Sequence, residues 1–232
     1  MEIISTGNEE IDTHMGGGLP MPSLVVIEGE HGTGKTVVAA QLIKGILDAD
    51  MKVLCVTENT VRDYLQKMKA VTFDFSKQFL QNKLIIESLQ IQGLDWSAAN
   101  SSLLLSTVEK YITSKSKKTN CVVIDSLSLL TLHSNHNTIL NFITKCKHLV
   151  SNGMSVVITM HPESLSSEIG MRLKSASDGY IHLSSSKVGD KAVKIMKTIK
   201  LIGSVAQPEP QFAFDIDPIF GLKIVPISMS GV

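Results

Sequence analysis

Arginine is nearly absent from this chain of 232 residues: Arg62 and Arg172 are the only two, and lysine supplies the other 20 positive charges. Aromatic residues are also scarce, at 5%. Proteins read base edges with arginine forks and stack single-stranded bases on aromatic rings. Lys+Arg and Asp+Glu both number 22, so no net positive field attracts nucleic acid either. The composition therefore argues against nucleic acid as a partner.

Cysteine and long apolar runs are the next two shortages. Cys55, Cys121 and Cys146 lie in apolar segments without metal-ligand spacing, so we expect buried hydrophobes in a reducing cytosol. No run approaches the ~18 apolar residues of a membrane span. Acids at Glu2 and Glu9 argue against a signal peptide. We expect a cytoplasmic protein without direct membrane insertion, which reaches the cytoplasmic face of a membrane only through partners.

The bulk properties favour one globular domain over residues 1–232, with a substantial core. The hydrophobic fraction is 43% and the mean hydropathy is +0.17. These values are high for a soluble chain of this size. We therefore expect a large core together with some apolar surface that serves partners.

One segment matches the phosphate-binding loop (Walker A) pattern G-x-x-x-x-G-K-[ST]. It follows a short apolar strand over 23–28 and precedes a helical pattern over 37–47, which is the context that the pattern requires. Glycines turn tightly and expose N–H groups, and a helix start adds partial positive charge, so a nucleoside triphosphate is the expected ligand. The expected contacts are Gly29, Glu30, His31, Gly32, Thr33, Gly34, Lys35, Thr36 and Val37. Lys35 is expected on the β- and γ-phosphates, and the Thr36 hydroxyl on Mg²⁺.

Apolar runs alternate with helical patterns along most of the chain. Strands are expected over 52–57, 83–87, 121–124 and 154–160, and helices over 60–69, 98–114 and 138–150. A capping box at Thr6–Glu9 predicts a short helix that ends at Gly16–Gly18. From Asp178 onward, extended segments over 180–184, 191–202, 211–215 and 222–225 are joined by Gly and Pro turns. The pattern predicts an α/β fold with a mostly parallel central sheet, flanked by helices, and a mostly antiparallel C-terminal extension.

Asp125 ends the apolar run Cys121–Ile124, as a Walker B acid does. At the carboxyl end of a strand it is expected beside the phosphate loop, where it would hold Mg²⁺ through water. Glu58 ends the preceding strand and is the candidate for polarising an attacking water. A structural carboxylate paired with Lys35 is the alternative for Glu58. His161 follows the 154–160 strand and is either a γ-phosphate sensor or an ordinary polar residue at a strand end.

These motifs together resemble the RecA-like ATPases and, within them, the KaiC-like branch. Further resemblance is to the archaellum (archaeal flagellum) accessory ATP-binding family, known as FlaH or ArlH. It is carried by Ile4–Asn8, Glu30–Lys35, Val123–Ser128, Phe214–Pro218 and Gly221–Ser228. The resemblance implies ATP and Mg²⁺ as cofactors, a homo-hexameric ring, and partners among the motor's hexameric ATPase and membrane-associated archaellum components.

Two departures from that family pattern bear on hydrolysis. KaiC-like enzymes tend to carry two consecutive acids where this chain has Glu58-Asn59, and a Lys-x-Arg pair across the subunit interface where it has Lys200-Leu201-Ile202. Lys200 or Lys197 would replace the arginine only as a point charge, without its fork geometry. A missing arginine of this kind lowers turnover by roughly 10³–10⁵. We therefore expect tight ATP binding with slow or negligible hydrolysis.

Other functions on the same fold stay open at this point. A DNA-processing ATPase would need a basic surface that bears aromatic residues. A circadian-type autokinase would need a duplicated domain. Arg62, Asp63 and Tyr64 follow Glu58 at a distance that suits contact with the base, and they fit a solvated helix start equally well.

Overall fold

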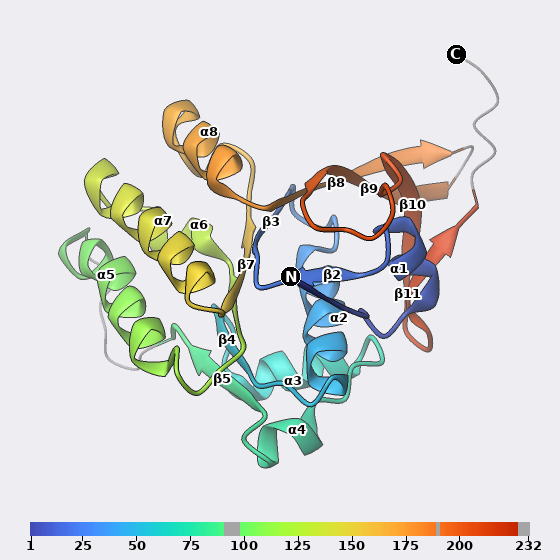
Figure 1. Ribbon diagram of the computed structural model, residues 1–232, viewed down its shortest axis with the longest axis horizontal. Coiled ribbons are helices and arrows are strands. Elements are labelled where there is room, and N and C mark those ends of the chain that lie inside the picture. Colours follow the sequence, from blue (N-terminus) through green and yellow to red (C-terminus); the bar gives the residue numbers. More distant parts are fainter. Residues whose placement is uncertain (91–97, 189–190, 227–232) are drawn as a thin grey trace.

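A nine-stranded sheet organises the protein (Figure 1), whose computed structural model describes residues 1–90, 98–188 and 191–226. The spatial order of the strands is β11-β10-β9-β8-β3-β7-β6-β4-β5. The strands of this sheet are β3 (Leu24–Gly29), β4 (Val53–Thr57), β5 (Leu84–Ser88), β6 (Cys121–Asp125), β7 (Ser155–Met160), β8 (Gly179–Val188), β9 (Lys191–Leu201), β10 (Gln211–Asp217) and β11 (Gly221–Val225). Beside it, β1 (Glu2–Ile4) and β2 (Leu19–Met21) form a two-stranded antiparallel ribbon.

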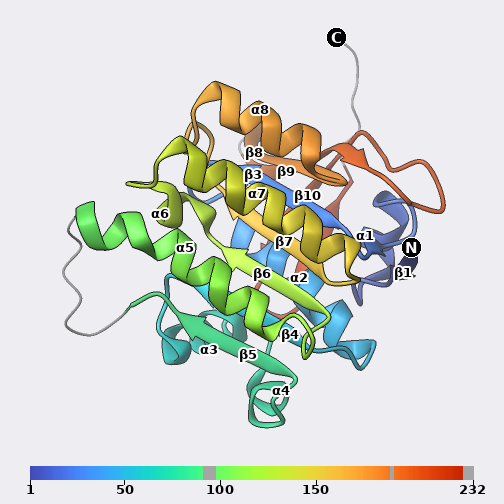
Figure 2. The same ribbon diagram turned by 60° about the vertical axis from the view of Figure 1, so that its left-hand side comes forward.

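Helices cover the two faces of this sheet. One face carries α5 (Ala98–Lys115), α6 (Leu127–Thr131), α7 (His136–Ser151) and α8 (Ser167–Ala176), which lie side by side in Figure 2. The other side carries α1 (Glu9–His14), α2 (Lys35–Asp48), α3 (Val61–Lys69) and α4 (Ser76–Leu80). Within the described residues, none of the helices combines the length and the apolar character that crossing a bilayer requires.

Strand direction changes once across the sheet. From β5 to β8 all neighbours run parallel, and β9, β10 and β11 then pair antiparallel. The sequence placed the start of the antiparallel extension at the segment 180–184. The extension was predicted as mostly antiparallel, and β8 is its exception on one edge: it pairs in parallel with β3 and antiparallel with β9. The prediction of a mostly parallel sheet with an antiparallel C-terminal extension is confirmed.

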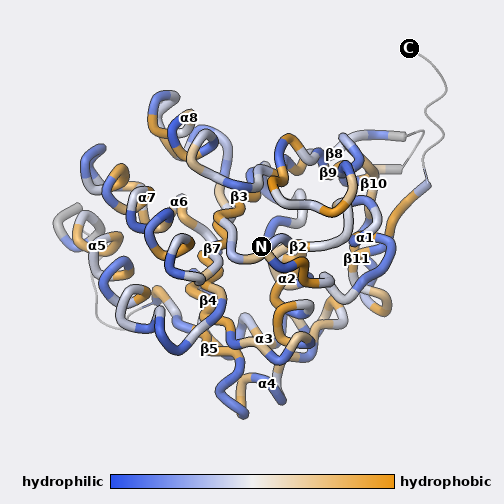
Figure 3. Tube along the Cα trace, viewed as in Figure 1, coloured by the Kyte–Doolittle hydropathy of each residue, from blue (hydrophilic) through white to orange (hydrophobic). Residues whose placement is uncertain are grey.

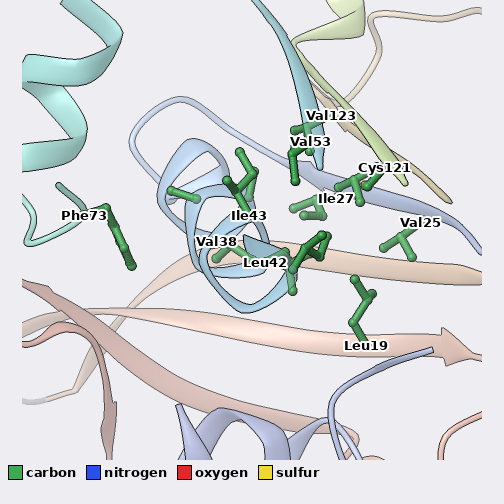
Figure 4. Close-up of a cluster of buried hydrophobic side chains, with 14 of the residues drawn as sticks. Leu19, Val25, Ile27, Val38, Leu42, Ile43, Val53, Phe73, Cys121 and Val123 are labelled. Atoms are coloured by element: carbon green, nitrogen blue, oxygen red, sulfur yellow. The ribbon is translucent and has the colours of Figure 1, made fainter. Parts of the chain in front are cut away.

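Alternate residues of the central strands feed two separate cores. In β3, Val25 and Ile27 pack into the core around α2, whereas Leu24 and Val26 pack into the core under α7. Figure 4 shows Val38, Leu42 and Ile43 of α2 in one buried cluster with Val25 and Ile27. Both faces of a parallel strand are buried, which is why these strands have continuous apolar sequences. Figure 3 shows hydrophobic colours along the inner strands and α2, and hydrophilic colours on α4.

The N-terminal capping prediction needs a correction. Asn8, not Thr6, caps α1: its side chain accepts hydrogen bonds from the N–H groups of Glu10 and Ile11. The Thr6 hydroxyl instead donates to the Asn8 carbonyl at 3.3 Å. Asn is as good an N-cap as Thr, and the left-handed Gly7 (φ 77°) delays the helix start by two residues.

Several short elements escaped the sequence patterns. They are β1, β2, α4, α6 and α8, which span 3 to 10 residues each. Periodicity needs a longer window than most of these provide. The predicted longer elements are present with ends shifted by a residue or two, as is usual, except that β8 continues four residues beyond the predicted 184. Ile227 and Ser228, at the end of the segment that resembles the archaellum family, lie outside the described residues.

Candidate functional site

The loop between β3 and α2 leaves the start of α2 without a side-chain cap. Its N-cap residue is Gly34, in the left-handed region (φ 94°), and no side chain caps the first N–H groups. Gly32 is left-handed as well (φ 78°). A Cβ on Gly34 would lie 2.9 Å from Ile216 Cδ1, so the loop passes close to β10. Uncapped N–H groups at a helix start provide an anion site.

Lys35 points back into this loop. Its Nζ donates to the carbonyl oxygens of Gly29 (2.7 Å) and Glu30 (2.9 Å), and only 8% of the residue is exposed. Burial lowers the pKa of Lys35, while the nearby carboxylates of Asp125, Glu30 and Glu58 act in the opposite direction. The ammonium is therefore held at the mouth of the loop, where an anion would meet it.

Thr36, in the first turn of α2, contacts Asp125 at the carboxyl end of β6. The Thr36 hydroxyl donates to Asp125 Oδ1 at 3.2 Å, and Thr159 Oγ1 on β7 donates to the same oxygen at 2.6 Å. Burial raises the pKa of Asp125, against the effect of these two hydroxyls and of Lys35 and His161. A hydroxyl and a carboxylate beside a phosphate loop are the protein oxygens that Mg²⁺ takes when phosphates and water supply the rest.

These residues fit a Mg²⁺ ion that nucleotide and protein share. In the described part of the chain, three or more His, Cys, Asp or Glu side chains do not converge in an arrangement that would hold a metal alone. Mg²⁺ is commonly held by one or two protein oxygens plus substrate phosphates. The arrangement therefore suits Mg²⁺ carried by a triphosphate, with Thr36 and Asp125 as the protein side of the site.

Glu58 is bound to Ser126 and forms no ion pair with Lys35. Glu58 Oε1 accepts a hydrogen bond of 2.9 Å from the Ser126 hydroxyl, and the Glu58 N–H donates to the Asp125 carbonyl at 3.2 Å. The peptide bond between Asp125 and Ser126 is cis. The alternative of a Glu58–Lys35 pair was therefore wrong. Glu58 lines the same cavity as Lys35, and its catalytic role stays a prediction.

His161 lies at the centre of the site. Its Nδ1 is 3.3 Å from Lys35 Nζ, its ring centroid is 3.9 Å from that of His31, and its N–H donates to Ser128 Oγ at 2.9 Å. Burial, together with the charges of Lys35 and His31, lowers the pKa of His161, which favours the neutral ring. The side chain of His31 thus lies against the His161 ring, with the two ring planes tilted by 33°.

A cavity of about 440 Å³ joins these groups, at the carboxyl ends of β3, β7, β6 and β4. It is lined by His31, Gly32, Gly34, Lys35, Thr36, Glu58, Asn59, Asp125, Ser126, His161 and Ile216. Gly29 and Glu30 contribute through their carbonyls, and Thr33 Oγ1 donates to the Glu30 carbonyl at 2.8 Å. Val37 packs against the core around α2. Most residues predicted for the site are thus brought together.

Lys200 lies elsewhere. Its Nζ donates to the carbonyls of Ser177 (2.5 Å) and Ser175 (3.3 Å), and it lines a second hollow beside α8. A role for Lys200 at a neighbouring subunit's site stays a prediction. Tyr64, considered for the base, is instead 1% exposed in the core, and Asp63 accepts a hydrogen bond from the capping residue Thr60. The interpretation of that segment as a helix start is confirmed.

Four contributors to the site were missed. Thr159 holds Asp125, Ser126 holds Glu58, and Asn59 and Ile216 line the cavity. The signal for Thr159 was a polar residue that follows three apolar residues, close to the carboxyl end of the strand. Ile216 offered no local signal, because it reaches the loop only through the order of strands in the sheet.

Comparisons with known proteins agree with a nucleotide site of this kind. A family model described as "ATPase: KaiC" matches residues 4–229. The chain is 37% identical to the archaeal flagellar ATP-binding protein FlaH of Sulfolobus acidocaldarius, over 98% of this chain and 99% of that protein.

Two crystal structures share the fold. The flagellar accessory protein FlaH from Methanocaldococcus jannaschii matches with a TM-score of 0.87 at 19% identity, covering 97% of this chain and 100% of that one. A KaiC-like protein from Pyrococcus horikoshii matches with a TM-score of 0.76 at 22% identity, covering 97% and 99%.

Proposed function

Because this chain belongs to the KaiC family of ATPases and, within it, to the archaeal flagellar FlaH proteins, we propose that it is the ATP-binding regulatory component of an archaellum motor and assembly complex. ATP binding promotes a homo-hexameric ring or engagement of the motor ATPase. The protein works at the cytoplasmic face of the membrane, which it reaches through membrane-associated archaellum components.

The nucleotide site uses the groups described above. The uncapped start of α2 and the Lys35 ammonium bind the phosphates, and Thr36 with Asp125 binds Mg²⁺, in the case of Asp125 through water. His161 reports on the γ-phosphate from the end of β7. Bound Mg²⁺ would neutralise phosphate charge; the chain's own residues orient the phosphates and exclude bulk water.

Weak hydrolysis follows from the residues around the phosphate and Mg²⁺ site. The observation that carries the proposal is a complete phosphate and Mg²⁺ site next to a sparse set of transition-state groups. Glu58 is followed by Asn59, not by a second acid, and Lys200 is bound to two carbonyls of its own chain. A lysine in that position offers one point charge where an arginine offers a fork. A nucleotide that persists on the protein suits a switch better than a motor.

Light scattering on purified protein, with and without Mg·ATP, tests this function. The average molar mass of the wild type should increase when Mg·ATP is added. That of Lys35→Ala should not, because its loop lacks the ammonium that binds the phosphates. Lys44→Ala is the matched control, since Lys44 lies on the same helix in an exposed ion pair with Asp48. A turnover assay on the assembled protein completes the test: steady hydrolysis above about 1 per second contradicts the switch.

A further inference from the structure

The charges divide this neutral chain into two parts of opposite sign. Residues 136–204 carry nine Lys and Arg against four Asp and Glu, and the rest of the chain carries thirteen against eighteen. The first part includes α7, α8, β8 and β9. A molecule with faces of unlike charge is complementary to a second copy of itself when the unlike faces meet.

An exposed apolar turn lies within the acidic part. Ile219 and Phe220, between β10 and β11, are 74% and 69% exposed. Asp217 Oδ1 accepts hydrogen bonds from the N–H groups of both residues, at 2.7 and 3.0 Å, so the turn has a defined shape. These two hydrogen bonds lower the pKa of Asp217, which keeps it charged. We call Asp217, Ile219 and Phe220 the acidic knob.

The surroundings of the knob are acidic too. Residues 1–14 contain four Asp and Glu and neither Lys nor Arg. Their helix α1 is tied to β11 because Asn8 Nδ2 donates to the Leu222 carbonyl at 3.0 Å. Glu10 lines the same shallow hollow as Phe220. Lys223, with its Nζ 6.0 Å from the Phe220 ring centroid, is the basic residue that lines this hollow.

A second hollow, whose charged lining residues are Lys174, Lys200, Glu28 and Glu163, lies beside α8. It has a volume of about 890 Å³ and exposes the apolar side chains of Met171 (68% exposed) and Ile199 (53%). Its buried acid Glu28 is neutralised by Lys174 at 3.0 Å. Lys200 is bound to neutral carbonyls, so its positive charge stays uncompensated within the described chain. Glu163 is the exposed acid of the lining. We call this hollow the α8 groove.

The knob cannot fill the groove of its own chain. Figures 1 and 2 show α8 well apart from α1, and β11 is tied to α1. A contact that joins the knob of one copy to the groove of another uses two different surfaces. Such head-to-tail contacts repeat from copy to copy and form a ring when the rotation closes.

We propose that the acidic knob of one copy seats in the α8 groove of a second copy, with Ile219 and Phe220 against Met171 and Ile199, and Asp217 facing Lys200. This inference rests on the proposed ring assembly and names the surfaces that make it. Apolar side chains in the centre bury area, and the unlike charges around them select the partner face.

Two variants that each lose one surface test the contact. Phe220→Glu removes an apolar side chain of the knob. Met171→Glu places an acid in the groove, where it repels the acidic knob. Each variant alone should lose self-association by at least about tenfold in sedimentation velocity with Mg·ATP. An equimolar mixture should form dimers and nothing larger, because one intact knob and one intact groove remain. Leu80→Glu, at a residue 79% exposed on α4, is the control and should assemble like the wild type.

Several results would overturn the contact. Circular dichroism must first show that both variants fold. If either folded variant then assembles like the wild type, or if the mixture stays monomeric, the knob does not seat in the groove. A basic face could instead bind single-stranded DNA; low-salt binding that Met171→Glu abolishes, with self-association unchanged, also overturns the proposal.

The contact and the proposed function can fail separately. If Mg·ATP has no effect on the wild type, yet both variants weaken self-association at high protein concentration, the contact stands and the ATP switch fails. If Mg·ATP drives Phe220→Glu into rings, the switch stands and the contact fails. A wild type that is monomeric under all of these conditions sinks both.

Discussion

Thr159 donates a hydrogen bond of 2.6 Å from its Oγ1 to Asp125 Oδ1, between the neighbouring strands β7 and β6. Neither side chain reaches bulk water to any large extent, since Thr159 is fully buried and Asp125 is 7% exposed. With the bond from Thr36 to the same oxygen, Asp125 is held in one orientation. The carboxylate is therefore set in place before any ligand arrives, which lowers the cost of binding.

Thr159→Val should weaken Mg²⁺-dependent nucleotide binding. The two side chains have nearly the same shape, but valine cannot orient Asp125, so the loss should be about tenfold in affinity. Calorimetric titration with Mg·ATP, and with ATP in the presence of EDTA, measures it. Binding without Mg²⁺ should change little. Thr131→Val, at a buried threonine that bonds the Leu127 carbonyl, is the control. Equal losses with and without Mg²⁺ would rule out a role through Asp125.

Asp125→Asn should stabilise the nucleotide-free protein while impairing Mg²⁺ binding. Burial raises the pKa of Asp125, so folding favours its protonated form. The stability that the protonated Asp125 carboxyl contributes to the folded state is present below the ordinary carboxyl pKa and is lost as the pH rises through the raised pKa. The advantage of asparagine should therefore be small at acid pH and reach about 1–3 kcal/mol near neutrality.

Urea denaturation at pH 4 and pH 7.5 checks that sign. Asp50→Asn is the matched control, because the exposed Asp50 has its pKa lowered by a hydrogen bond from Lys83. The stability that Asp50 contributes is present above the ordinary carboxyl pKa and is lost as the pH falls. Asp50→Asn should therefore lower the stability at pH 7.5, where Asp125→Asn raises it. An Asp125→Asn variant less stable than the wild type at pH 7.5 would contradict the argument.

Gly34→Ala and Gly153→Ala should cost similar stability but differ in binding. Both glycines are left-handed, with φ of 94° and 92°, so alanine costs each about 1–2 kcal/mol. A Cβ on Gly153 meets nothing within 4 Å, whereas one on Gly34 presses on Ile216 Cδ1, which can move at little cost. Thermal unfolding should give comparable shifts. Only Gly34→Ala should lose Mg·ATP affinity; retained affinity would place the phosphates elsewhere.

The three cysteines should be unreactive in the folded protein. Each is fully buried, and burial raises the pKa of Cys55 to about 12 and that of Cys121 and Cys146 still further. A thiolate is the reactive form, so alkylation at pH 8 should be slow until the protein unfolds. Mass spectrometry after iodoacetamide treatment, with and without urea, measures the labelling. Rapid labelling of Cys146 without urea would show that α7 opens locally.

Much of the fold could be read from local patterns. The apolar runs at Leu24–Gly29, Cys121–Asp125 and Ser155–Met160 are buried on both faces, so their strand character is visible in the sequence. The phosphate loop was equally legible because glycine, lysine and threonine have fixed spacings there. Short elements such as α6 and the β1–β2 ribbon were missed, since packing against distant residues, not propensity, holds them.

The candidate site was predicted in its backbone parts more fully than in its side-chain contacts. Spacing placed Lys35 and Thr36, and a strand end placed Asp125. The alternative in which Glu58 pairs with Lys35 was wrong because Ser126 comes from a neighbouring strand end, whose side-chain direction no pattern reports. His31 and His161 are 130 residues apart in the chain, so the contact between their rings could not be foreseen.

The amino-acid order alone determined the phosphate loop and the strand and helix on either side of it. Steric limits on glycine and the burial of apolar runs act over a few neighbouring residues, so a local pattern reports them. The tertiary structure decided which carboxylate meets which hydroxyl, that Lys200 binds carbonyls beside α8, and that the acidic knob and the α8 groove lie apart. Those relationships depend on strand order in the sheet, which brings together residues that no local interaction connects.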